Sequence, residues 1–118
     1  MTDNLYSEIW EAYTTCWSNT DETNRKQKLS QLLNVDCTYT DPNIETIDID
    51  SLSNYMGQFQ SGYSGAKFVT TDFKVHHDQS LTHWNMVNSD GTILSKGASF
   101  GAYKNGKLCK MTGFFWNA

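Results

Sequence analysis

The second half of the chain decides the fold: residues 67–116 read KFVTTDFKVHHDQSLTHWNMVNSDGTILSKGASFGAYKNGKLCKMTGFFW. Apolar and polar residues alternate along this stretch with the period of two that is typical of half-buried β-strands. Turn-forming residues interrupt the alternation at Asp78-Gln79, at Ser89-Asp90-Gly91 and at Lys104-Asn105-Gly106. Since such short connections join antiparallel neighbours, we expect a meander of four strands over residues 67–77, 80–88, 93–103 and 108–116.

The first half of the chain predicts three helices. Apolar residues recur at helical spacing from Leu5 to Trp17, and the polar residues 18–21 can cap a second helix. The inner face of that second helix would carry Leu29, Leu32 and Leu33. A third helix is expected over Asp50–Phe59, with Asp50 as its cap, and a short strand over Asp36–Thr40 that Asp41-Pro42 ends. Helices in one half and a sheet in the other predict the α+β class.

Length and charge limit the classes of function. A chain of 118 residues is expected to form a single domain over residues 1–118. Its 13 acidic and 9 basic residues give a net charge of −4, which repels phosphate backbones, so no nucleic-acid partner is expected. No segment approaches the roughly 20 apolar residues of a membrane span, and the first residues lack the pattern of a signal peptide. We therefore expect a cytoplasmic protein without membrane contact.

Cysteine and histidine residues do not predict a metal site. Cys16, Cys37 and Cys109 are an odd number without close pairing, which favours free thiols over disulfides or structural zinc. His76 and His77 flank one turn together with His83, but strict alternation would place His76 and His77 on opposite faces. Too few histidines would then share a face to bind a metal ion.

Several local strings carry a resemblance to a known family: Trp17 with Thr20-Asp21, Leu32-Leu33, the run CTYTDP over 37–42, His76-His77-Asp78, Trp84, and TGFF over 112–115. With their order along the chain, they resemble the SnoaL-like members of the nuclear transport factor 2-like (NTF2-like) superfamily. The resemblance implies a cone-shaped α+β fold, in which three N-terminal helices pack on a curved antiparallel β-sheet around a hydrophobic pocket. Isomerases, dehydratases, cyclases and non-enzymatic binding proteins share this fold.

The resemblance extends distantly to ketosteroid isomerase and implies roles for three residues. Asp41 matches the aspartate that serves as general base, and Tyr13 matches the tyrosine that donates a hydrogen bond to the oxyanion. The position of the family's acidic donor falls on Ser99, whose hydroxyl is a weaker donor than a neutral carboxylic acid. If the chain is an enzyme, the resemblance implies a cofactor-independent isomerase or lyase.

Each of these residues also has a purely structural interpretation. Asp41 precedes Pro42, and aspartates in such pairs commonly accept hydrogen bonds from backbone amides in a turn. Tyr13 shares a helix face with Ile9 and Trp17, so a neighbouring core group could satisfy its hydroxyl as well as a ligand could. The residues alone leave both alternatives open.

Alternation propagated from Ser99 predicts which side chains face the concave side of the sheet. The set comprises Thr82, Trp84, Met86, Ser99, Gly101, Met111, Gly113 and Phe115. Adding aromatic residues of the helices and the first strand gives the predicted ligand-binding residues Trp17, Tyr39, Tyr55, Phe59, Trp84, Met86, Met111 and Phe115. A small apolar or carbonyl-containing molecule would suit such a lining. A filled core built from the same residues is the alternative.

The opposite face of the sheet would expose Phe100, Phe114 and Trp116. So much aromatic surface is typical of an interface, and a homodimer through this convex face is expected. Two functional hypotheses remain. One is a cofactor-free isomerase, cyclase or dehydratase that uses Asp41 and Tyr13; the other is a non-catalytic homodimeric ligand-binding or interaction domain.

Overall fold

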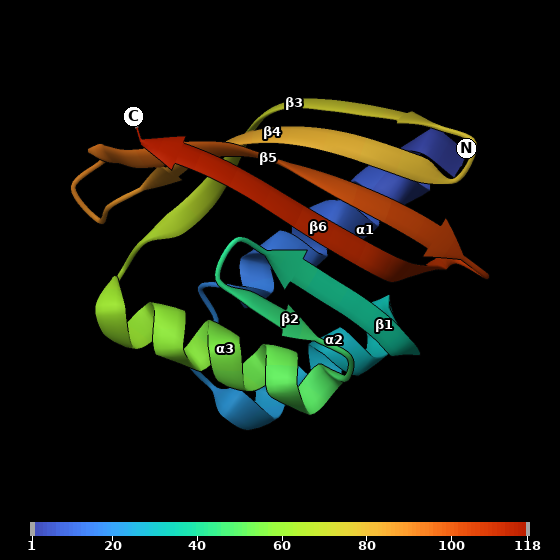
Figure 1. Cartoon of the computed structure of the whole chain (residues 1–118), viewed down its shortest axis with the longest axis horizontal. Helices are drawn as coiled ribbons and strands as arrows, with labels where there is room; N and C mark the ends of the chain where they lie inside the picture. The colour runs from blue at the N-terminus through green and yellow to red at the C-terminus, as the bar shows by residue number, and fades with distance from the viewer. Residues whose placement is uncertain (1, 118) are drawn as a thin grey trace.

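Three helices pack against one side of a six-stranded sheet in the computed structural model (Figure 1). The structure describes residues 2–117, with side chains for residues 5–116. The elements in chain order are α1 (Thr2–Cys16), α2 (Glu22–Leu32), β1 (Leu33–Asp41), β2 (Ile44–Thr46), α3 (Ile49–Gly62), β3 (Lys67–His76), β4 (Gln79–Val87), β5 (Ile93–Lys104) and β6 (Lys107–Asn117). The predicted α+β class, with three helices and a curved sheet, is confirmed.

The sheet has the strand order β2-β1-β6-β5-β4-β3. Strands β3 to β6 form the antiparallel meander that the alternation predicts. The sheet is mixed rather than wholly antiparallel, because β1 lies parallel to β6, with Tyr39 opposite Met111. This strand spans 9 residues instead of the predicted five, and the three-residue β2, which the sequence did not predict, pairs with its end.

Capping residues explain where the helices begin and end. Asp21 accepts a hydrogen bond from the backbone amide of Asn24 and starts α2. Asp48 does the same for α3 by accepting from the amide of Ser51, so the prediction of Asp50 as the cap is wrong by two residues. Leu33, predicted on the inner face of the second helix, is extended and begins β1. Leu33 is fully buried in the strand, as it would have been on the inner face of the predicted helix.

The β3–β4 turn corrects the prediction for the histidines. His77 and Asp78 have φ values of 50° and 60°, as the two central residues of a type I′ hairpin turn require. His77 therefore leaves the strand, and alternation no longer applies to it. The Nδ1 atoms of His76 and His77 lie 3.0 Å apart instead of on opposite faces.

The two faces of the meander differ in burial as predicted, except that Phe100 on the convex face is half-buried rather than exposed. On the concave face Thr82 and Met111 are fully buried beneath the helices, whereas on the convex face Phe114 is 60% and Trp116 51% exposed. Close approach of α1 requires Gly101, since a Cβ atom there would lie 2.9 Å from the indole of Trp10. None of the described helices is long and apolar enough to cross a membrane.

Tyr103 gives the fold a predicted sensitivity to alkali. Its ring stacks on Tyr6 at 4.0 Å, its hydroxyl lies 2.9 Å from Ser80 Oγ, and burial raises its pKa to about 12. Because the pKa is raised from about 10 in the unfolded chain, the contribution to stability is complete below pH 10. It is lost as the pH rises from 10 to about 12.

In that pH range the free energy of unfolding should fall by about 1.4 kcal/mol per pH unit for each buried tyrosine that stays neutral. Tyr103→Phe should remove one such contribution from the slope, measured by urea unfolding between pH 9 and pH 12. An unchanged slope in this variant would show that Tyr103 ionises as freely in the folded protein as in the unfolded chain.

Candidate functional site

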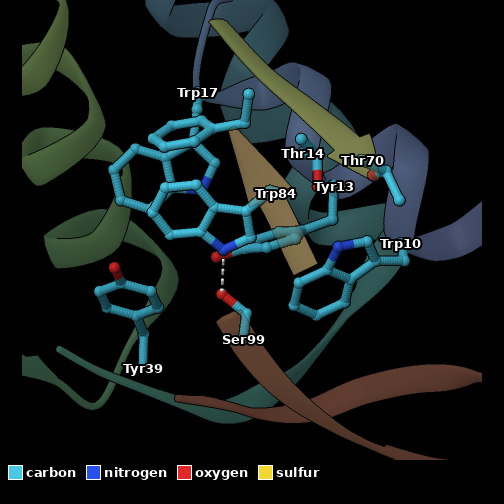
Figure 2. Close-up of a pocket in the computed structure, with 9 residues that line it drawn as sticks. Trp10, Tyr13, Thr14, Trp17, Tyr39, Thr70, Trp84 and Ser99 are labelled. Carbon is cyan, nitrogen blue, oxygen red and sulfur yellow. Dashed lines mark hydrogen bonds between the residues drawn. The ribbon is translucent and has the colours of Figure 1, made fainter. Parts of the chain in front are cut away.

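Two neighbouring hollows lie between the helices and the concave face of the sheet. The outer pocket has a volume of about 380 Å³ and is lined by Trp17, Asp41, Asn43, Phe59, Tyr63, Phe68, Trp84, Met86, Leu94, Ser95 and Phe115. The inner cavity has about 40 Å³ and is lined by Trp10, Tyr13, Thr14, Trp17, Tyr39, Phe68, Thr70, Trp84 and Ser99 (Figure 2). Trp17, Phe68 and Trp84 border both hollows and form the wall between them.

Asp41 presents its carboxylate at the end of β1, beside the outer pocket. Its Oδ2 accepts hydrogen bonds from the hydroxyls of Tyr39 at 2.6 Å and Tyr55 at 3.0 Å. Its Oδ1 accepts from the backbone amide of Asn43 at 2.8 Å. Oδ1 therefore has the backbone contact expected of an aspartate in a turn, whereas Oδ2 has side-chain contacts beside the pocket. Since a carboxylate has about four acceptor positions, three hydrogen bonds leave one position for a further partner.

The two tyrosines that bind Asp41 are neutral donors at neutral pH. Burial raises the pKa of Tyr55 to about 12, and the neighbouring Asp41 carboxylate adds to the effect. Burial raises the pKa of Tyr39 further still, helped by Tyr13 and Asp41. Both hydroxyls consequently keep their protons and hold the carboxylate in one orientation.

Tyr13 and Ser99 border the inner cavity rather than the outer pocket. Tyr13 extends from α1, and burial raises the pKa of its hydroxyl well above the usual value. Ser99 lies on β5 and accepts a hydrogen bond from Trp84 Nε1 at 3.0 Å, as Figure 2 shows. A serine hydroxyl that accepts one bond can still donate its proton. Both residues can therefore offer a hydrogen bond to an oxygen atom that reaches the cavity.

Residues from the linings of both hollows meet at Gly113 on β6. A Cβ atom at this position would lie 3.7 Å from Asp41 Cβ, from Ser99 Oγ and from the hydroxyl oxygen of Tyr39. The missing side chain thus leaves one space that these three groups surround. Two of the three predicted catalytic residues, Asp41 and Ser99, meet at this point, while Tyr13 lines the inner cavity together with Ser99.

The predicted ligand-binding residues are distributed over both hollows. Trp17 and Trp84 border both, Tyr39 borders the inner cavity, and the outer pocket is lined by Phe59, Met86 and Phe115. Tyr55 lines neither hollow and contacts the site through its hydrogen bond to Asp41. Met111 also lines neither; it is 1% exposed, and its sulfur lies 3.3 Å from Cys37 Sγ.

Sequence reasoning missed several lining residues, of which Phe68 is central. Phe68 pairs with Met86 and Thr70 with Trp84 across the β3–β4 ladder, so both share the concave face. Alternation extended through the hairpin would have placed both on the convex face, because the register of β3 shifts at an irregularity between Thr70 and Asp72. Ser95 shares the face of Ser99 by alternation and was left out of the predicted set, whereas Asn43 and Tyr63 lie outside the strands and Leu94 lies at the start of β5.

Metal-binding groups do not gather in the described part of the chain. Among those residues no three His, Cys, Asp or Glu side chains are close enough to hold a metal ion. His83 Nδ1 instead lies 3.9 Å from the Asp72 carboxylate on the neighbouring strand, and the three cysteines are free thiols.

Comparison with solved structures decides the fold. A "putative isomerase of the SnoaL-like family" from Agrobacterium tumefaciens C58 superposes with a TM-score of 0.89 at 17% identity, over 97% of this chain and 99% of that one. An NTF2-like protein from Cytophaga hutchinsonii gives 0.70 at 11% identity, over 93% and 88% of the two chains. The chain has the NTF2-like fold. A "putative polyketide cyclase" from Sinorhizobium meliloti gives 0.73 at 14% identity, over 90% and 93% of the chains.

The comparisons by sequence add nothing to this result. No protein-family model matches the sequence, and neither does any curated protein. At identities of 11 to 17% the structural similarity establishes the NTF2-like fold alone. Arguments about the function of this NTF2-like chain must therefore rest on its own pocket.

Proposed function

We propose that this chain binds a small, largely apolar molecule with a carbonyl group and that Asp41 acts on it as a general base. The observation that carries the proposal is the Asp41 carboxylate, held by Tyr39 and Tyr55 at the wall of a pocket of about 380 Å³. Aromatic and aliphatic side chains make up most of the remaining wall. An apolar ligand body buried against them gains about 25 cal/mol per Å².

The proposed step is the transfer of one proton. A C–H bond next to the ligand's carbonyl group breaks, its proton moves to the carboxylate of Asp41, and the electron pair shifts onto the carbonyl oxygen. Tyr13 and Ser99 donate hydrogen bonds to the resulting enolate oxygen. Return of the proton to a different carbon completes an isomerisation, and loss of a leaving group completes a lyase reaction. No cofactor is needed for either outcome.

The names of two neighbours support this class of reaction. One neighbour is called a putative isomerase of the SnoaL-like family, and another a putative polyketide cyclase. An isomerisation next to a carbonyl group can proceed through an enolate, which a carboxylate base and hydroxyl donors can serve. The proposal for this chain rests on Asp41 and its pocket, and the names only agree with it.

A non-catalytic binding domain is the second candidate. The hydrogen bond from the Asn43 amide to Asp41 favours it, because that bond is the expected one for an aspartate that stabilises a turn. The three donors on Asp41 also satisfy most of its acceptor positions without any ligand. In this case the pocket would bind the same kind of molecule without transferring a proton.

We further propose that the working form is a homodimer of one-domain chains that pair through the convex face. Phe114 and Trp116 on β6 are more than half exposed on this face, and Leu81 on β4 and Val69 on β3 are each 42% exposed. An apolar surface of this kind is unfavourable in water, and a two-fold pairing of sheets would bury it. The concave pocket would remain open in such a dimer.

Exchange of ketone α-protons for deuterium tests the proposed reaction without knowledge of the natural substrate. Short 2-alkanones and cyclohexanone in D₂O buffer, followed by proton NMR, should lose their α-proton signals faster with the protein than with buffer alone. A ketone too large for the pocket serves as the control. Binding of ketones without any acceleration of exchange would contradict the enzymatic proposal and favour the binding domain.

A further inference from the structure

Three aromatic rings separate the outer pocket from the inner cavity. Trp17, Phe68 and Trp84 border the outer pocket on one side and the inner cavity on the other. The inner cavity has a volume of about 40 Å³. It can admit a few water molecules but not the body of a ligand, which the outer pocket of about 380 Å³ can hold.

Of the three rings, Trp84 is fixed most directly to the sheet. Its indole lies on the backbone of β5 at Gly97, where a Cβ atom would come within 2.2 Å of Trp84 Cζ2. Its Nε1 donates to Ser99 Oγ at 3.0 Å, and Phe68 packs edge-on against it at 4.9 Å. The indole is held in this orientation by Gly97 below it, by the Ser99 hydroxyl at its edge and by the Phe68 ring beside it.

The inner cavity behind Trp84 has a lining that suits a ligand, although its volume is too small to hold one. Hydroxyl groups of Tyr13, Thr14, Thr70 and Ser99 border it, together with the rings of Trp10 and Tyr39 (Figure 2). Removing the indole would join this space to the outer pocket, because Trp84 borders both. Trp17 is less suitable for such a change, since its ring packs against four others in the core.

We propose that Trp84 is a specificity-determining residue that limits the length of the ligand in the outer pocket. The inference rests on the proposed binding of a largely apolar carbonyl compound. With the carbonyl group at Asp41 and Ser99, beside Gly113, the ligand's apolar end stops at the indole of Trp84. Without it, a longer ligand extends into the space that the indole and the inner cavity occupied.

A series of 2-alkanones with six to fourteen carbons tests this inference by isothermal titration calorimetry. For the parent, the affinity should rise about fourfold per methylene and then level off at the length that fills the pocket. In Trp84→Ala the rise should continue for about three more carbons, since the removed indole leaves room for several methylene groups. Trp84→Leu should extend the levelling length by fewer carbons, and it replaces the alanine variant in the test if that variant does not fold.

Phe73→Ala is the matched control, because Phe73 is an aromatic residue of the same sheet that packs against the core and lines neither hollow. It should leave the levelling length of the parent unchanged. The same levelling length in the parent and in both Trp84 variants would overturn the inference.

The result also separates this inference from the proposed function. If no ketone binds to the parent, the proposed function fails. Binding of long ketones to Trp84→Ala would then still identify the indole as the barrier, whereas binding to neither protein would overturn the inference as well.

Discussion

Phe114→Glu is expected to convert a dimeric parent into a monomer. Phe114 lies on β6 opposite Ala98 of β5, and its side chain is 60% exposed on the convex face. In the proposed dimer this side chain would be near the centre of the interface, beside Trp116. Burying an unpaired carboxylate there should cost several kcal/mol per copy, which is enough to separate the two chains at micromolar concentration. Size-exclusion chromatography with light scattering measures the change in mass.

Ile47→Glu provides the matched control for this change. Ile47 is also exposed and apolar, at 69%, but it lies in the loop before α3 and away from the meander. The control should keep the mass of the parent. A parent that is already monomeric at high concentration contradicts the proposed dimer, as does a Phe114→Glu variant that remains dimeric.

The meander was predictable because its information is local. Alternation along residues 67–116 and turn residues such as Asn105-Gly106 determine both the strand positions and the face that each side chain occupies. The same pattern placed Met86 and Phe115 at the pocket and Phe114 and Trp116 on the opposite face. Where a turn takes an unusual backbone conformation, as at His77, the alternation fails.

The parallel strand β1 was only partly predictable, because its pairing is not local. Leu33 continues the apolar spacing of α2, so a helical period describes it as well as a strand does. Its place is decided by Leu108, the residue opposite it on β6, 75 positions further along the chain. No window of neighbouring residues contains that information.

The sequence predicted which residues form the candidate site, but not how their side chains are arranged. The sequence indicated Asp41, Tyr13 and Ser99, but it could not show that Tyr13 and Ser99 line the inner cavity while Asp41 lines the outer pocket. It also could not show that Tyr39 and Tyr55 donate to the Asp41 carboxylate. These contacts depend on how α3 meets the end of β1, which is a property of the packed structure.

The central claim is that Asp41 transfers a proton in an apolar pocket, and Asp41→Asn tests it most directly. The asparagine side chain has nearly the same shape, but its amide cannot serve as a base. Affinity for a ketone that fits the pocket should change little, because the apolar wall is unaltered. The rate of α-proton exchange should fall by about 10²-fold or more.

Asp48→Asn is the control for this measurement, since asparagine also caps a helix and Asp48 lies at the start of α3 rather than in the pocket. Proton NMR in D₂O should show exchange at the parental rate in Asp48→Asn and close to the buffer rate in Asp41→Asn, with both variants folded and binding the ketone. An Asp41→Asn protein that exchanges the α-protons as fast as the parent would contradict the claim.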